Sequence, residues 1–152
     1  GNPLTGPNPN PVLEAEGEGL TAQARRQRFA PNDFVFDLLN SEPETNGMGG
    51  EIRVGNVNSL PSLEEEGVSY TLFVLEPCGV NLPHVHPRAT EMIMVLQGDN
   101  LRTAFTEENG GRALVNDVGL GDVTFFPQGL IHYQQNLGCQ NVTRCSTSAI
   151  TP

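Results

Sequence analysis

The sequence predicts an all-β fold, a sandwich or barrel built from short strands. Runs rich in β-branched and aromatic residues recur along the chain, with turn residues between them roughly every eight to twelve positions. The 17 glycines and 12 prolines favour turns over long helices. A length of 152 residues suits one domain that can bury a core of its own.

The amino-terminal part differs in composition from the rest of the chain. Residues 1–19 are rich in Pro, Gly, Asn and Glu, which predicts an extended arm over residues 1–28. Within it, residues 20–28 favour a short helix capped by Thr21. Residues 29–152 are then expected to form a single domain.

Strand signals dominate after an apolar patch at 33–39, expected to dock the arm onto the core, and a glycine-rich loop at 40–51. Residues 107–111 indicate a hairpin turn, because Asn and Gly accept positive φ. The expected strands are 52–57, 69–75, 82–86, 91–96, 101–106, 112–118, 123–126, 131–135 and, more weakly, 142–146. The phenylalanines expected in the core are Phe73, Phe105, Phe125 and Phe126.

Charge and composition exclude several classes of function. The net charge of −10 repels nucleic acid and anionic membranes, so neither is an expected partner. All eight basic residues are arginines, which excludes chemistry that needs a lysine amine. No apolar run approaches the ~18 residues of a membrane-spanning helix. The three histidines, at 84, 86 and 132, are the whole supply of imidazole for any site.

The cysteines and one glycosylation sequon indicate in which cellular compartment the protein resides. Cys78, Cys139 and Cys145 form no Cys-x-x-Cys pair, which excludes a zinc knuckle or thioredoxin-type motif. Asn141 begins a glycosylation sequon, and a chain that starts at Gly1 without Met is either a processed secreted protein or a trimmed chain. We therefore expect an extracellular protein.

The His-Val-His sequence at 84–86 is the pattern that points to chemistry. Residues two apart on a strand face the same side, and two buried imidazoles are costly unless a metal ion satisfies their lone pairs. A turn at 87–90 would bring Glu91 back on the neighbouring strand to face them. His132 follows a later turn and supplies a third imidazole. Three nitrogens and one carboxylate suit Mn, Fe, Ni, Cu or Zn.

These residues resemble the two motifs of the cupin superfamily. The second motif matches at every spacing, and the first departs by one residue between its glycine and first histidine. The motif positions are Gly79, His84, His86, Glu91 and Gly98, then Gly121, Pro127, Gly129, His132 and Asn136. Residues 77–81 and 84–91 are similar to germins and germin-like proteins, and Cys78 with 136–139 is similar to spherulins of fungi and slime moulds. The resemblance covers about residues 30–140.

The resemblance implies a single jelly-roll β-barrel with a Mn(II) site, Fe, Cu, Ni and Zn being the alternatives. The implied ligands are His84, His86, Glu91 and His132. Four protein ligands on an octahedral ion leave two positions for a bidentate anion, or for water and dioxygen. In germin-type oxalate oxidases two asparagines are thought to hold substrate. Asn81 matches one, while Thr71 replaces the other. Asn81 and Glu91 are then the expected catalytic residues, and the alternative for Asn81 is an Asx turn.

Two functions follow from this resemblance. The first is a secreted Mn-dependent oxidoreductase that cycles between Mn(II) and Mn(III) and either dismutates superoxide or oxidises a small dicarboxylate such as oxalate. Its partners would be a small anion or a dioxygen species. The second is a non-enzymatic, metal-stabilised extracellular, stress or storage protein that binds carbohydrate or another partner.

Strand register predicts a disulfide. If the two histidine-bearing strands pair antiparallel with Val85 roughly opposite His132, then Cys78 falls opposite Cys139, because the sum of paired positions stays constant. A Cys78–Cys139 disulfide suits a secreted chain. The alternative is two buried free thiols. Cys145 is left over, either buried or free.

A homo-oligomer is expected, with a dimer favoured over the hexamer that germins form. Residues 146–152 show no helical pattern of the kind that helps to build the hexamer. On the strand at 91–96, alternate residues starting at Glu91 would face inward and Met92, Met94 and Leu96 outward. These outward side chains would form the dimer contact, unless they pack between the two sheets instead.

Overall fold

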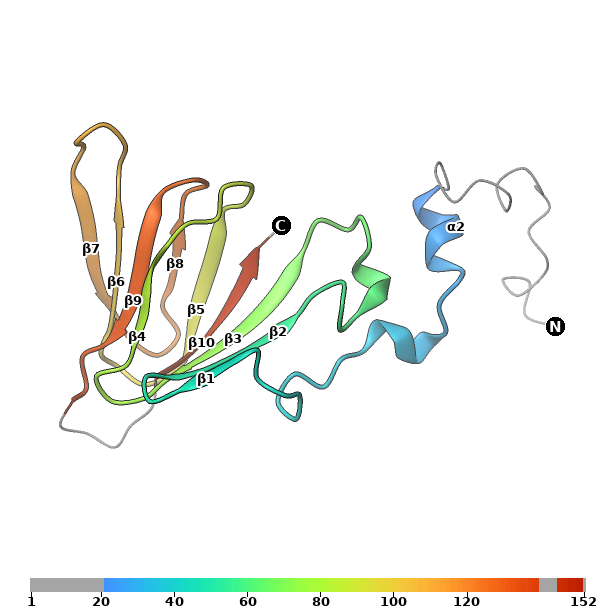
Figure 1. Cartoon of the computed structure of the whole chain (residues 1–152), viewed down its shortest axis with the longest axis horizontal. Coiled ribbons are helices and arrows are strands. Elements are labelled where there is room, and N and C mark those ends of the chain that lie inside the picture. The colour runs from blue at the N-terminus through green and yellow to red at the C-terminus, as the bar shows by residue number, and fades with distance from the viewer. Residues whose placement is uncertain (1–20, 140–144, 152) are drawn as a thin grey trace.

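A computed structural model describes residues 21–139 and 145–151 and contains two antiparallel sheets. The six-stranded sheet has the order β1-β2-β3-β10-β5-β8, and the four-stranded sheet has the order β4-β9-β6-β7 (Figure 1). The strands are β1 (Thr45–Gly47), β2 (Gly50–Gly55), β3 (Ser69–Leu75), β4 (Val80–His84), β5 (Glu91–Gln97), β6 (Leu101–Thr106), β7 (Ala113–Val118), β8 (Val123–Phe126), β9 (Ile131–Asn136) and β10 (Cys145–Thr151). The predicted all-β jelly-roll fold is confirmed.

The core lies between the two sheets, because both contribute to one cluster of buried apolar side chains. Its members are Phe73, Leu75, Ile93, Val95, Leu101 and Phe126. Leu101 comes from the four-stranded sheet and the others come from the six-stranded one. Burial of these side chains supplies the main free energy of folding, about 1.5–3 kcal/mol for each large one.

Strand β5 alternates between core and surface as its sequence predicts. Glu91, Ile93 and Val95 are at most 1% exposed, whereas Met92 and Met94 are 52% and 43% exposed. The outward methionines therefore do not pack between the sheets. The β6–β7 hairpin also forms as expected, with Asn109 and Gly110 both at positive φ in its turn.

Two predicted segments differ from the structure. Residues 45–55, mostly assigned to a loop, form the β1–β2 hairpin, in which Gly50 adopts a φ of +132° that favours glycine. The last described strand, Cys145–Thr151, extends beyond the predicted end at 146 and pairs with both β3 and β5, while residues 142–144 lie outside the described residues. Its serines and threonines weaken the hydrophobic signal, but backbone pairing on both sides holds it in the sheet.

Two segments predicted to be buried contain apolar side chains that are exposed to solvent. Phe125 lies on the outer face of β8 and is 53% exposed, since Phe126 takes the inward position beside it. In the patch at 33–39, Val35 and Leu39 are each more than 70% exposed, whereas Phe36 and Leu38 are half-buried and Phe36 lies beside Gly55 of β2, so only part of the patch docks.

The described part of the arm carries one short helix, α2 (Ala22–Arg26), which lies to one side of the sheets in Figure 1. The predicted cap is confirmed, since Thr21 Oγ1 accepts a hydrogen bond from the Ala24 amide at 3.2 Å. Short 3-10 turns follow at Pro31–Phe34 (η1) and Pro61–Leu63 (η2). Among the described residues, no helix has the length and hydrophobicity to cross a bilayer.

The predicted disulfide between Cys78 and Cys139 is confirmed, with a Cα–Cα distance of 4.6 Å. The register used to predict it is only approximate. His84 pairs with His132, and a bulge between Asn81 and His84 shifts the rest of β4 against β9. Both cysteines lie beyond the strand ends in turns and tolerate that shift. The sequon at Asn141 lies outside the described residues.

Candidate metal centre

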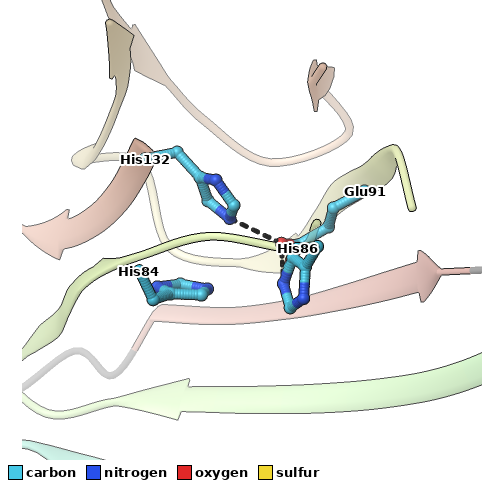
Figure 2. Close-up of side chains that lie close together, drawn as sticks. All are labelled: His84, His86, Glu91 and His132. Carbon is cyan, nitrogen blue, oxygen red and sulfur yellow. Dashed lines mark hydrogen bonds and ion pairs between the residues drawn. The ribbon is translucent and has the colours of Figure 1, made fainter. Parts of the chain in front are cut away.

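Four side chains from three strands and a turn meet inside the barrel (Figure 2). They are His84, His86, Glu91 and His132, and their ligand atoms all lie within 4.8 Å of one another. His84 ends β4, His132 is the second residue of β9, and Glu91 begins β5. The predicted cluster is therefore assembled by the fold from both sheets.

The route by which these residues meet differs from the predicted hairpin. β4 and β5 belong to different sheets, so the turn between them carries the chain across the barrel instead of reversing it within one sheet. Glu91 reaches the histidines from the opposite wall. The strand also ends at His84, and His86 lies in the turn, where its ring stands nearly perpendicular to that of His84 at 5.1 Å.

The distances within the cluster match an octahedral ion. Glu91 Oε2 lies 3.0 Å from His86 Nε2 and 3.0 Å from His132 Nε2. Two ligands at right angles on an ion with bonds of ~2.1 Å are separated by ~3.0 Å. A single cation bound to this carboxylate oxygen could therefore hold both imidazoles beside it.

Hydrogen bonds at the outer ring nitrogens select the tautomer that binds metal. His84 Nδ1 lies 2.7 Å from the Leu82 carbonyl, and His132 Nδ1 lies 2.9 Å from the Leu130 carbonyl. A carbonyl can only accept, so each Nδ1 carries the proton and a neutral ring presents a bare Nε2. In that tautomer the bare Nε2 of His132 faces a carboxylate oxygen at 3.0 Å, and either a proton or a metal ion can join the two acceptors.

A metal ion joins these acceptors better than protons do. The cluster offers one carboxylate for three imidazoles, and protonating all three would leave buried excess positive charge. Burial lowers the pKa of His84 below its ordinary value, the hydrogen bond to the Leu82 carbonyl opposing it. Glu91 Oε1 is buried without a hydrogen-bond partner among the described residues. These donors fit a metal that takes imidazole and carboxylate ligands.

The aromatic ring of Phe126 fixes the plane of His132. The two rings are stacked, 9° from parallel with centroids 4.3 Å apart, and both side chains are almost fully buried. Because the ring cannot tilt, the Nε2 lone pair keeps its direction toward Glu91. Such support of a ligand's orientation is usual around metal sites.

The predicted substrate residues are not members of the cluster. Asn81 is on the inner side of β4 and donates from Nδ2 to Gln134 Oε1 at 2.7 Å. Thr71 lies on β3 in phase with the core residues Phe73 and Leu75, so it shares their inward face. Contact of either residue with substrate stays a prediction.

Sequence reasoning missed the polar continuation of the His132 face along β9. His132, Gln134 and Asn136 are each 2% exposed, so three polar side chains point into the barrel in succession. Asn136 closes the strand, donating to the Leu75 carbonyl and accepting from the Gly138 amide. The sequence signal for this polar face was the recurrence of polar residues at every second position of β9.

A family model described as "Cupin" matches residues 36–147. The chain belongs to the cupin family. Within that family it is a germin-like cupin with similarity to spherulins. It is 37% identical to Spherulin-1A of Physarum polycephalum, over 72% of this chain and 44% of that protein. It is 40% identical to a germin-like protein of Arabidopsis thaliana (subfamily 2 member 5), over 78% of this chain and 55% of that protein.

Among solved structures, a recombinant oxalate oxidase in complex with glycolate is similar to this cupin. The TM-score is 0.68 with 28% sequence identity, over 78% of this chain and 58% of that one. The chain thus spans about half the length of the curated relatives named above. It is a germin-like cupin with an oxalate oxidase as a structural neighbour and a His/Glu cluster suited to a metal.

Proposed function

We propose that this germin-like cupin binds manganese and acts as a secreted oxidoreductase on a small anion, either superoxide or a dicarboxylate of the oxalate type. The observation that carries the proposal is the position of Glu91 Oε2, at 3.0 Å from both His86 Nε2 and His132 Nε2. Similarity to an oxalate oxidase solved with glycolate, which is described for that enzyme as a substrate analogue, supports the reaction class.

Manganese, when bound, would supply a one-electron redox couple between Mn(II) and Mn(III). The chain's own residues hold it. Backbone carbonyls fix the rings of His84 and His132, and the Glu91 carboxylate offsets part of the charge of a divalent cation. Four protein ligands leave two positions of an octahedral ion for a small anion or dioxygen species. The His86 side chain is 35% exposed and marks the side open to solvent.

The test is metal analysis followed by titration of the metal-free protein with Mn(II). At a Mn(II) concentration of 100 times its Kd, binding stabilises the fold by about 2.7 kcal/mol, which raises Tm by roughly 5–10 °C in a chain of this size. We expect His84→Ala to abolish that rise and the superoxide or oxalate turnover. Val85→Ala, at an exposed neighbouring position, serves as the control. A native protein that contains zinc or no metal would refute the redox proposal.

A second candidate, a metal-stabilised extracellular or storage protein, is favoured by where the ligands lie. His84 and His132 belong to the four-stranded sheet and Glu91 to the six-stranded sheet, so a bound ion would cross-link the two walls of the barrel. This role predicts the same Mn(II)-dependent rise in Tm with no turnover of superoxide or oxalate. Activity of the manganese-loaded protein therefore separates the two candidates.

Secretion is part of the proposal and is supported by the disulfide. Cys78 and Cys139 both lie at exposed positions, where cytosolic reductants would reach them, so the bond suits an oxidising compartment. Mass analysis of protein from its native source, with and without reductant, tests the state of this pair.

A further inference from the structure

His86 is held differently from the other two histidines of the cluster. His84 and His132 lie on strands, and a backbone carbonyl fixes each of their rings at Nδ1. His86 lies in the turn between β4 and β5, and its side chain is 35% exposed. Its ring meets the cluster through Nε2, at 3.0 Å from Glu91 Oε2. The position of this imidazole therefore depends on what holds the turn.

A second turn, at residues 127–130, holds the turn that carries His86. Each turn crosses from one sheet to the other, the first between β4 and β5 and the second between β8 and β9. The Gly129 amide donates to the His86 carbonyl at 3.0 Å. Gly129 has a φ of +78°, a conformation that favours glycine. A backbone hydrogen bond thus joins the two turns at the histidine itself.

Gln128 adds two further hydrogen bonds between the turns. Its side-chain Nε2 donates to the Pro87 carbonyl at 3.0 Å, and its backbone amide donates to Thr90 Oγ1 at 3.3 Å. Pro87 directly follows His86 in the sequence, and Thr90 directly precedes Glu91. Gln128 therefore spans the turn from the residue after one member of the cluster to the residue before the next.

The side-chain hydrogen bond of Gln128 contributes little to folding by itself. Gln128 is exposed, so water can replace it at the Pro87 carbonyl with a small change in unfolding free energy. The four flanking strands are paired in their sheets without it. What the bond restricts is movement of the turn that carries His86. Partners outside the ligand shell have this effect at metal sites, where they orient the ligands.

We propose that Gln128 is a positioning residue for the metal centre and acts through the turn of His86. The inference rests on the proposed metal function and deepens it by naming the residue that keeps the exposed imidazole in place for the cation. The other two imidazoles are held by strands and carbonyls. Loss of the Gln128 side chain should therefore loosen one ligand and leave the barrel folded.

The first test needs no metal. In the metal-free protein, hydrogen exchange of the Gly129 amide reports opening of its bond to the His86 carbonyl. We expect Gln128→Ala to speed that exchange by about 3–10-fold and to leave the urea midpoint unchanged. Gln97→Ala, at an exposed glutamine that ends β5, is the matched control. Unchanged exchange in Gln128→Ala would overturn the proposal.

The second test titrates the full chain with Mn(II), followed by calorimetry and by the manganese EPR spectrum. We expect Gln128→Ala to raise the Mn(II) Kd by about 3–10-fold and to shift the spectrum toward that of His86→Ala. Gln128→Met keeps the length of the side chain without its donor. It should behave like Gln128→Ala if the hydrogen bond, rather than packing, positions the turn.

A double-mutant cycle separates positioning of His86 from a general effect on the fold. If Gln128 acts through His86, Gln128→Ala adds nothing to the loss of Mn(II) affinity in His86→Ala, whereas a general effect would make the two losses additive. Additive losses, or an unchanged Kd in Gln128→Ala, would overturn the role of Gln128 while leaving the metal site intact. Failure of the native protein to bind Mn(II) would overturn the proposed function as well.

Discussion

At the scale of single residues, the centre depends on Glu91. Its side chain is fully buried, one oxygen lies against two imidazoles and the other has no hydrogen-bond partner among the described residues. A carboxylate in that position is unfavourable by itself, because burial removes its hydration. It becomes favourable when a cation binds. The buried charge of Glu91 therefore favours cation binding and destabilises the metal-free fold.

Glu91→Gln tests this directly. The amide keeps the shape but loses the charge, so we expect Mn(II) affinity to fall at least ~100-fold, beyond the usual effect of altering a supporting residue. In the metal-free protein the same change should leave the unfolding free energy unchanged or higher. Glu108→Gln, in the exposed β6–β7 turn, is the control. Undiminished Mn(II) binding by Glu91→Gln would exclude this residue as a ligand. Calorimetry and chemical denaturation give the two measurements.

At the scale of elements, the Cys78–Cys139 disulfide joins the turn before β4 to the segment after β9. These two strands supply His84 and His132, and the pairing between them is interrupted by the bulge after Asn81. The covalent link lies on the other side of the bulge from the two histidines, beside the hydrogen bond from the Asn136 amide to the Gly79 carbonyl. It therefore adds a covalent constraint to the paired end of β4 and β9.

Removal of the disulfide should lower the unfolding free energy. The bridged residues are 61 apart in sequence, and closing a loop of that length restricts the unfolded chain by up to about 4 kcal/mol. We expect the Cys78→Ser, Cys139→Ser double variant to lose about 2–4 kcal/mol of unfolding free energy, measured by urea denaturation. Reduction of the native protein should reproduce the loss. A variant as stable as the oxidised protein would contradict this role.

At the scale of the whole molecule, the outer face of the six-stranded sheet is apolar over β5 and β8. Its exposed side chains come from the adjacent strands β5 and β8, which pair directly. They are Met92, Met94, Leu96, Val123 and Phe125, each at least 43% exposed. Contiguous apolar surface of this kind is uncommon on a monomer and marks an interaction site. The same patch on two copies is self-complementary, as a two-fold dimer requires.

We expect this face to mediate a homodimer. Met94→Lys with Phe125→Lys would place two charges in the contact and should shift the protein to monomer, as measured by sedimentation equilibrium. Val115→Lys, at an exposed apolar position on the other sheet, is the control and should leave the dimer intact. A native chain that sediments as a monomer at all accessible concentrations would refute the prediction.

Several features follow from local sequence. Alternation placed Glu91, Ile93 and Val95 inward, and Asn109-Gly110 fixed the β6–β7 turn through positive φ. The candidate ligand set followed from the resemblance to the two cupin motifs, which include every histidine of the chain. The alternation and the turn depend on side-chain period and turn chemistry, which act over a few residues.

Other features depended on contacts between distant segments. The assignment of β4 and β5 to different sheets, the bulge in β4 and the pairing of β10 with both neighbours all arise from long-range backbone pairing, which no local pattern encodes. The Asn81–Gln134 hydrogen bond joins residues 53 apart, so it could not be predicted before both strands were placed. The sequence by itself predicted the fold class, the disulfide and the four candidate ligand residues. Only the tertiary structure decided how those candidate ligands face one another, because opposing walls of a barrel meet through packing rather than through sequence neighbourhood.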